Sequence, residues 1–307
     1  MKGIDETNCK QEVLVLKDEA ELVLPVKADL GEGPCWDSQN GVLYWVNILG
    51  ETVNIYNPET NENREIDVNQ LVGTVVPRKS GGLALALEKG FYFLDLETEQ
   101  LTEIVDPESQ LPENRFNDGK CDPYGRFWAG TLSLSEEQGK GSLYCLHSDF
   151  KVEKKVGDLT ISNGLAWSPD HKFMYLIDTP TKKVTRFDYD GETGAIENPV
   201  AVIEFKEGQG YPDGMTIDDE GMLWIAHWAG AQVSRWNPET GEQLISIPIP
   251  ALNVTSCTFG GADLKTLYIT TARKNMTEEE LEKYPLTGGL FKIEIDVKGS
   301  PAYSFGG

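Results

Sequence analysis

The fold of this chain is decided by residues 160–194, TISNGLAWSPDHKFMYLIDTPTKKVTRFDYDGETG. The stretch predicts a short strand, a turn, a strand that carries Tyr175, a second turn, a third strand and a final turn marked by Gly194. On its own in water, a single sheet of this size leaves at least one of its faces exposed. Further copies of the unit would supply the missing contacts, and the sequence contains them.

Six copies of this unit follow one another along the chain. Each has an aromatic or leucine marker on a strand that comes after a Gly or Asp turn, and the markers are separated by 41 to 49 residues. The markers are Tyr44, Leu85, Trp128, Tyr175, Trp224 and Tyr268. All-β repeats of this length are typical of a β-propeller, in which radial packing covers both faces of each four-stranded sheet. We therefore predict an all-β fold, a six-bladed β-propeller; two β-sandwiches would explain the strands but not the period.

The repeats also predict the domain organisation. We expect residues 19–307 to form a single propeller domain and residues 1–18, which are polar apart from VLVL, to form an N-terminal extension. A strand near the start of the chain should complete the last blade and close the ring. Both ELVL (residues 21–24) and VLVL (residues 13–16) are candidates for that strand.

Composition excludes several classes of function. The chain has 27 basic and 50 acidic residues and a formal net charge of −23, which disfavours binding to nucleic acid or to an anionic membrane. Its five cysteines are scattered and contain no CxxC pair, which argues against a disulfide framework and a zinc knuckle. No signal peptide or membrane-spanning run is visible. We expect a cytoplasmic protein, either a monomer or a small homo-oligomer.

A ring of polar residues is predicted in the central channel. Stepping back 11 or 12 residues from each marker reaches Glu32, Thr74, Asn117, Asn163, Asp213 and Ser256. In a propeller the strand before the marker is the innermost one, so equivalent positions in six blades converge on the axis. Polar residues beside glycine are common in turns, so any one of these residues could be an ordinary turn residue. Six such residues at equivalent positions are less well explained in that way.

The ring has the chemistry of a metal site. Glu32 and Asp213 supply two carboxylates, and Asn117 and Asn163 supply neutral amide oxygens. Ca²⁺, Mg²⁺ and Mn²⁺ prefer such hard oxygen ligands, whereas Zn²⁺ usually takes His or Cys. A divalent ion with open positions can polarise a carbonyl and acidify a water molecule. The sequence therefore indicates a central site for one divalent metal ion.

Ordered motifs along most of the chain carry a family resemblance. They are LGEGPCWD (30–37), NRFNDGKCDPYGRFWAGT (114–131), ISNGLAWSPD (161–170), YPDGMTIDDEGMLW (211–224) and TSCTFGGADLKTLYITTAR (255–273). Together they resemble the SMP-30/gluconolactonase/luciferin-regenerating family, and within it the regucalcin-type lactonases. The resemblance runs from about residue 20 to the C-terminus. It implies a six-bladed propeller with one divalent metal ion, calcium foremost, and hydrolysis of a small-molecule sugar lactone.

The resemblance also assigns roles to particular residues. By motif it makes Glu32, Asn163 and Asp213 the metal ligands, and Arg115 and Asn117 the residues that hold the substrate. We expect Asp213 to act in addition as the general base that deprotonates the attacking water.

Two features of the chain leave alternatives open. Where the family has a further acidic substrate contact after Thr131, this chain reads LSLSEEQGKGS, so Glu136 or Glu137 is a loose candidate. No G-x-S-x-G motif is present, and the histidines are poorly placed for a triad, although His227 could approach the channel mouth as an alternative base.

Two rival functions fit the same site. A non-catalytic calcium-binding propeller would use the ring only to hold the ion. A metal-dependent esterase or phosphoesterase would act on a different substrate. Assays of metal-dependent hydrolysis with glucono-1,5-lactone and a wider substrate panel would distinguish these functions.

Overall fold

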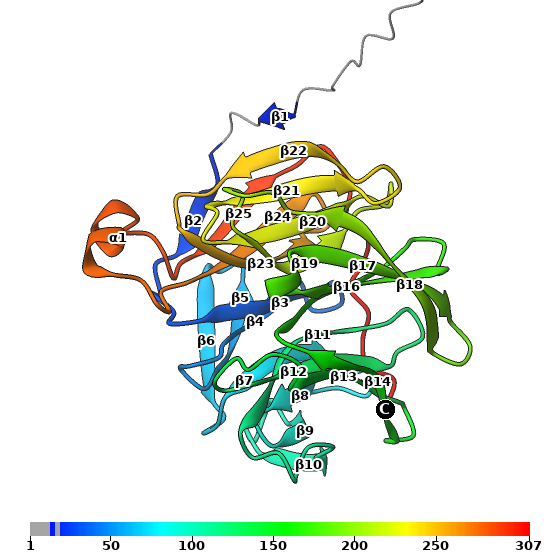
Figure 1. The fold of residues 1–307 in the computed structure, drawn as a ribbon. Coiled ribbons are helices and arrows are strands. Elements are labelled where there is room, and N and C mark those ends of the chain that lie inside the picture. Colours follow the sequence, from blue (N-terminus) through cyan, green and yellow to red (C-terminus); the bar gives the residue numbers. More distant parts are fainter. Residues whose placement is uncertain (1–12, 16–18) are drawn as a thin grey trace, which may run out of the picture.

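Six antiparallel sheets surround a common centre in the computed structural model, which describes residues 13–15 and 19–307 (Figure 1). The first strands of successive sheets pack side by side around that centre, and the last sheet returns to the first. The fold is therefore the predicted six-bladed β-propeller. We number the blades 1 to 6 in the order of their innermost strands.

The first three blades follow the chain in simple order from the axis outward. Blade 1 holds β3 (Gly31–Asp37), β4 (Val42–Asn47), β5 (Thr52–Asn57) and β6 (Glu62–Asp67). Blade 2 holds β7 (Val72–Pro77), β8 (Leu83–Leu87), β9 (Gly90–Leu94) and β10 (Leu101–Val105). Blade 3 holds β11 (Asn114–Cys121), β12 (Phe127–Ser133), β13 (Gly141–Leu146) and β14 (Val152–Leu159).

The remaining blades carry the short helices and the closing strand. Blade 4 holds β15 (Ser162–Trp167), β16 (Phe173–Asp178), β17 (Lys183–Asp190) and β18 (Ala195–Glu204), with the 3₁₀ turn η1 (Thr179–Thr181) after β16. Blade 5 holds β19 (Tyr211–Ile217), β20 (Leu223–Trp228), β21 (Gln232–Asn237) and β22 (Glu242–Pro248). Blade 6 holds β23 (Asn253–Gly260), β24 (Thr266–Ala272), β25 (Leu290–Glu294) and β2 (Glu21–Leu24), with α1 (Glu278–Lys283) between β24 and β25.

Ring closure is made by ELVL. β2 pairs antiparallel with β25 and forms the outer edge of blade 6, so the start of the described propeller completes the last sheet. Of VLVL, the described residues include β1 (Leu14–Val15), which pairs in parallel with β22 of blade 5 instead. The rest of the predicted N-terminal extension, residues 1–12 and 16–18, lies outside the described residues.

The markers that revealed the repeat fill the space between neighbouring blades. All six lie on the second strand of their blade and are buried. Trp128 stands edge-on to Trp167 of blade 4, Trp224 stands perpendicular to Phe259 of blade 6, and Tyr268 stacks on Trp36 of blade 1. Each such aromatic pair adds about 0.5–1.5 kcal/mol beyond area burial. The repeat is visible in the sequence because these contacts recur.

Every innermost strand carries one extra residue relative to the second strand. The pairing register shifts by one after Glu32, Phe116, Ser162 and Pro212, and likewise within blades 2 and 6. Such β-bulges bend a strand and re-aim its side chains. The sequence did not predict these bulges, and they lie where the strands approach the axis.

The C-terminal residues cross the opposite end of the channel. The Gly299 amide donates to Leu264 O in blade 6, the Phe305 amide to Pro77 O in blade 2 and the Gly306 amide to Gly125 O in blade 3. Residues 300–303 line a small cavity of about 40 Å³ beneath the ring. This segment covers the channel at the end away from the first residues of the inner strands.

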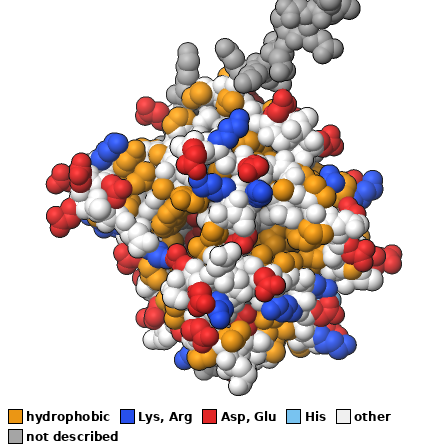
Figure 2. All heavy atoms as spheres, viewed as in Figure 1, with side chains coloured by type: hydrophobic (Ala, Val, Ile, Leu, Met, Phe, Trp, Pro, Cys, Tyr) orange, Lys and Arg blue, Asp and Glu red, His pale blue; other side chains and the backbone are white. Residues whose placement is uncertain are grey.

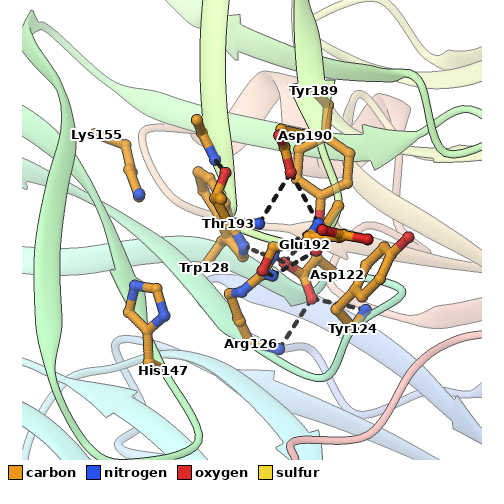
Figure 3. A network of polar contacts seen from close by, with 12 residues as sticks. Asp122, Tyr124, Arg126, Trp128, His147, Lys155, Tyr189, Asp190, Glu192 and Thr193 are labelled. Carbon is orange, nitrogen blue, oxygen red and sulfur yellow. Dashed lines mark hydrogen bonds and ion pairs between the residues drawn. The ribbon is translucent and has the colours of Figure 1, made fainter.

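A buried carboxylate, at the end of the channel that the C-terminal segment covers, joins blade 3 to blade 4 by hydrogen bonds (Figure 3). Asp122 lies in the turn between β11 and β12 and is fully buried. Its donors are the side chains of Arg126, Trp128 and Tyr189 and the backbone amides of Tyr124 and Arg126, at 2.8–2.9 Å. The Arg126 guanidinium also donates to the carbonyls of Gly191 and Glu192 in blade 4. One carboxylate thus organises a turn, an ion pair and an interface between blades.

We predict that Asp122→Ala lowers the free energy of unfolding by about 3–5 kcal/mol, because it leaves the buried Arg126 charge without its partner. Urea titration followed by tryptophan fluorescence measures the change. The matched control is Asp190→Ala, an exposed aspartate beside the neighbouring turn that accepts from the Glu192 and Thr193 amides and forms no ion pair among the described residues, and its loss should be much smaller. Equal losses in the two variants would contradict the assigned role of Asp122.

Candidate functional site

A cavity of about 270 Å³ opens at the end of the channel where the inner strands begin. Its polar wall contains Glu32 from β3, Arg115 and Asn117 from β11, Asn163 from β15 and Asp213 from β19. All five of these side chains are at least nine-tenths buried. The residues predicted to form the site therefore line one cavity, although their sequence positions span 182 residues.

The prediction of a ring of six was wrong at two positions. Glu32, Asn117, Asn163 and Asp213 each lie three residues before the partner of their blade's marker, as the strand register shows. Thr74 lies one residue before that partner and Ser256 two, because the turns in blades 2 and 6 differ in length.

The two misplaced residues have other contacts. Thr74 donates its hydroxyl to the carbonyl of Gly119 at 2.9 Å, and Ser256 lines the small cavity beneath the ring. The residues that occupy the equivalent ring position are Val72 and Thr255. Thr255 uses its hydroxyl on the carbonyl of Gly31 at 2.6 Å. The polar ring therefore has four members, from blades 1, 3, 4 and 5.

A one-way chain of hydrogen bonds sets the orientation of the amides. Arg115 Nη1 donates to Asn117 Oδ1 at 2.9 Å, and Asn117 Nδ2 donates to Asn163 Oδ1 at 3.0 Å. Asn163 Nδ2 donates to Thr179 Oγ1, whose hydroxyl donates to the carbonyl of Pro212, both at 2.9 Å. The bonds cross three blades and end beside Asp213. Because every donor points the same way, neither amide can flip without losing its partners.

Two carboxylates face the cavity without a cationic partner in contact. Burial raises the pKa of Glu32, and the negative charges of Asp213 and Asp118 raise it further. Burial also raises the pKa of Asp213, followed by the charge of Asp118. The described residues contain no ion pair to either side chain within 4 Å. Two desolvated like charges at one site are costly unless a cation or protons neutralise them.

The donor set fits a hard divalent cation. Oε2 of Glu32 accepts the Gly33 amide at 2.7 Å, which orients the carboxylate. Among the described residues no three His, Cys, Asp or Glu side chains are grouped as a metal cluster, so the set depends on amide oxygen as well as carboxylate. Carboxylate with amide oxygen suits Ca²⁺, Mg²⁺ or Mn²⁺ better than Zn²⁺.

Asp118 and Lys120 lie on the other side of the ring. Both line the small cavity beneath it, and burial raises the pKa of Asp118. The ammonium of Lys120 donates to the carbonyl of Met215 in blade 5 at 2.7 Å. Lys120 therefore connects blades 3 and 5 below the site.

Arg115 is buried rather than part of a surface ion pair. Its Nη1 donates to Asn117 and to the carbonyl of Phe116, and burial lowers the pKa of the guanidinium to about 10 against the opposing charges of Glu136 and Glu32. The group stays protonated at neutral pH. A cation held in this way is positioned to donate to a ligand in the cavity.

Only one of the two loosely predicted acids reaches the site. Glu136 lines the cavity mouth and pairs with Lys274 at 2.8 Å. Glu137 is not in the wall and lies 3.7 Å from Lys140 on its own loop. Lys274 and Thr179 were missed by sequence reasoning, since both lie in connections that follow second strands and neither belongs to the repeat.

His227 does not reach the cavity. It is fully buried in blade 5, its Nδ1–H donates to the carbonyl of Gln209 at 2.6 Å, and its Nε2 accepts from the hydroxyl of Ser234 at 2.5 Å. Because the Gln209 carbonyl can only accept, Nδ1 carries the proton of the neutral imidazole, and Nε2 is left to accept from Ser234, whose oxygen also accepts from Trp236 Nε1. Burial lowers the pKa of His227 to about 4. The imidazole is a neutral structural group, and the neighbouring Trp228 is the residue that lines the cavity.

The chain is similar to known proteins over most of its length. The family described as "SMP-30/Gluconolactonase/LRE-like region" matches residues 30–273. The chain belongs to this family. YvrE of Bacillus subtilis, named provisionally as a sugar lactone lactonase, is 43% identical over 94% of the chain and 99% of the relative. Regucalcin of Xenopus laevis is 40% identical over 94% of the chain and 98% of the relative.

Solved SMP-30/gluconolactonase-like structures have the same fold. A regucalcin of Agrobacterium tumefaciens, described as a calcium-binding protein, superposes with a TM-score of 0.92 at 28% identity, covering 96% of the chain and 99% of the relative. The family match spans all five polar residues of the cavity wall, from Glu32 to Asp213. Within the described residues, no helix is long and apolar enough to span a membrane.

We predict that His227 makes stability fall in acid. Its folded-state pKa is lowered from 6.5 to about 4, so the unfolded state binds more protons between these values and the contribution is lost as pH falls through that window. The loss amounts to about 3 kcal/mol. Urea unfolding at pH 7 and pH 4 should show that His227→Asn, which keeps a donor for Gln209, lacks this part of the pH dependence. The prediction would be wrong if the free energy of unfolding of His227→Asn fell between pH 7 and pH 4 by as much as that of the unmodified protein.

Proposed function

We propose that this protein is a metal-dependent lactonase that opens sugar lactones with water. The observation that carries the proposal is the convergence of two unpaired carboxylates, two oriented amides and a buried guanidinium on one cavity. Its relatives named as lactonase and regucalcin support a lactonase-family function. A cytoplasmic location, a single propeller domain over residues 19–307 and the absence of nucleic-acid or membrane partners belong to the same proposal.

Glu32, Asn163 and Asp213 would hold the divalent ion, with Ca²⁺ the first candidate. When bound, such an ion polarises an ester carbonyl and lowers the pKa of a water molecule. Glu32 is oriented for this by the Gly33 amide, and Asn163 by Asn117 and Thr179. These contacts pre-organise the ligands before any ion arrives, which limits the entropy lost on binding.

Asp213 is our candidate general base. A carboxylate has two oxygens, so one can hold the cation while the other accepts a proton from the attacking water. The water oxygen then bonds to the carbonyl carbon, the ring C–O bond breaks, and the released alkoxide oxygen is protonated. The product is the open hydroxy acid.

Arg115 and Asn117 would hold the substrate. The guanidinium is fixed by Asn117 and the Phe116 carbonyl, which leaves its other N–H groups to donate to sugar hydroxyls. Trp228 and Tyr211 add aromatic surface to the same wall. Flat aromatic faces suit the C–H surface of a sugar ring and exclude water from the reacting ester.

A non-catalytic calcium-binding protein is the second candidate. It is favoured by the donor set itself, which would hold a cation whether or not a lactone is turned over. One solved relative is described as a calcium-binding protein. Binding without hydrolysis of any lactone or phosphoester would decide for this candidate.

We predict that Asp213→Ala lowers kcat/KM for glucono-1,5-lactone at least about 100-fold, the usual contribution of a general base, with further loss from weaker ion binding. His227→Ala should keep most of the activity, because that imidazole lies outside the cavity wall. A pH-stat assay on variants checked for folding measures both. Full activity in Asp213→Ala would overturn the mechanism.

We predict that divalent ions stabilise the fold through the carboxylate pair. At 100 times its Kd, an ion bound only to the folded state adds about 2.7 kcal/mol. Since burial raises the carboxylate pKa values, protons compete with the ion, and its affinity should fall as the solution is acidified. Thermal melts with Ca²⁺, Mg²⁺ and Mn²⁺ measure the effect. Asp213→Asn should reduce it and Asp190→Asn should not; equal stabilisation of the two variants would contradict the ligand assignment.

A further inference from the structure

An ion pair joins opposite sides of the cavity mouth. Glu136 belongs to the loop after β12 in blade 3, and Lys274 follows β24 in blade 6. Their charged groups are 2.8 Å apart, and both residues line the cavity. The side chains are 43% and 25% exposed, so the pair lies at the boundary between cavity and solvent.

The two blades lie across the axis from each other. The inner strand of blade 3 packs between those of blades 2 and 4, and the inner strand of blade 6 packs between those of blades 5 and 1. In a closed ring of six, these two blades are three steps apart in either direction (Figure 1). The pair therefore spans the mouth instead of following its edge.

Both ends of the pair are held by backbone contacts. The Lys274 amide donates to Asp29 O at 2.8 Å, and the Lys274 carbonyl accepts from Asn253 Nδ2 at 3.1 Å. The Glu136 amide donates to Ser133 O at 2.8 Å, with a backbone φ of 56°. Anchored ends lower the entropic cost of forming the pair relative to two free surface chains.

The space below the pair is small, and charged side chains form part of its wall. The cavity of about 270 Å³ lies below the usual range for drug-sized ligands. Acidic side chains elsewhere are spread over the visible face together with Lys and Arg rather than gathered in one patch (Figure 2).

We propose that the Glu136–Lys274 pair determines substrate size. Resting on the proposed lactonase function, the inference is that the closed pair admits single-ring sugar lactones and disfavours lactones with a second sugar on the solvent side. A half-exposed pair is weak, so it opens thermally, and salt screens it. A compact lactone passes during opening, whereas an extended one would have to keep the pair separated throughout turnover.

Kinetics with two lactones test the size limit. The variant Glu136→Gln/Lys274→Met removes both charges, and Glu137→Gln/Lys140→Met is the matched control on the same loop. The measured quantity is kcat/KM for the disaccharide lactobiono-1,5-lactone relative to glucono-1,5-lactone. We expect this ratio to rise by between about 1.4-fold and fivefold in the first variant, the range of population ratios that an exposed ion pair sustains, and to stay unchanged in the control.

A charge-reversed variant distinguishes the effect of the ion pair from the effect of altering the loop. Glu136→Lys/Lys274→Glu should bring the ratio back toward that of the unmodified protein, because the pair forms again with opposite sense. About 1 M NaCl, at which the Debye length is about 3 Å, should raise the ratio in the unmodified protein and not in the neutral variant. An unchanged ratio in the neutral variant, or an equal rise in the control, overturns the proposal.

Thiol labelling tests access without turnover. Ile161→Cys, in a Cys9→Ser background, places a thiol in the cavity wall, and the native cysteines of the described residues are buried. Removing the pair should raise the labelling rate with fluorescein maleimide by between about 1.4-fold and fivefold, and that with iodoacetamide less. If no lactone is hydrolysed but labelling changes in this way, the proposed function fails and the size barrier stands. Equal changes for the two reagents overturn the barrier.

Discussion

The antiparallel pairing of β2 with β25 is the contact on which the site depends. Leu22 pairs with Phe291 and Glu21 with Lys292, so a strand from the start of the described propeller completes the last blade. A propeller blade buries its faces only against two neighbours, and an open ring would leave blades 1 and 6 each with one face in water. Closure also brings residues distant in sequence to a single axis, where Glu32 meets Asp213.

Convergence on that axis has an energetic cost. The carboxylates of Glu32 and Asp213 lose hydration on burial, and no cationic side chain among the described residues pairs with them in its place. The raised pKa values of both groups express that loss. Asp122, at the other end of the inner strands, shows the opposite arrangement, with five donors, one of which is a guanidinium. All three carboxylates are buried, but of the three only Asp122 is paired with a cationic side chain of the described residues. Unsatisfied buried charge in an otherwise well-bonded fold is the physical sign of a binding site.

Sequence reasoning recovered the parts of the molecule that repeat. The marker aromatics pack between blades at a fixed period, so the blade number was confirmed, and four ring positions could be found by counting back from them. Counting failed at Thr74 and Ser256 because it assumed turns of equal length, and one residue of difference moves a side chain to another face or depth. Thr179 and Lys274 gave no such signal, because loop contacts depend on the closed ring and not on local pattern.

The repeated strands and the unrepeated loops contribute different parts of the site. Bulged inner strands from four blades present the polar groups, and their positions are constrained by packing against both neighbours. The groups to which we assign control of access, Glu136 and Lys274, lie in loops outside the repeated strands, and loops vary more readily than the strands they connect. The polar groups on the inner strands and the loop residues at the cavity mouth can therefore change independently of one another. For that reason, strand motifs alone do not specify which lactone enters, and contacts across the mouth have to be considered for each chain.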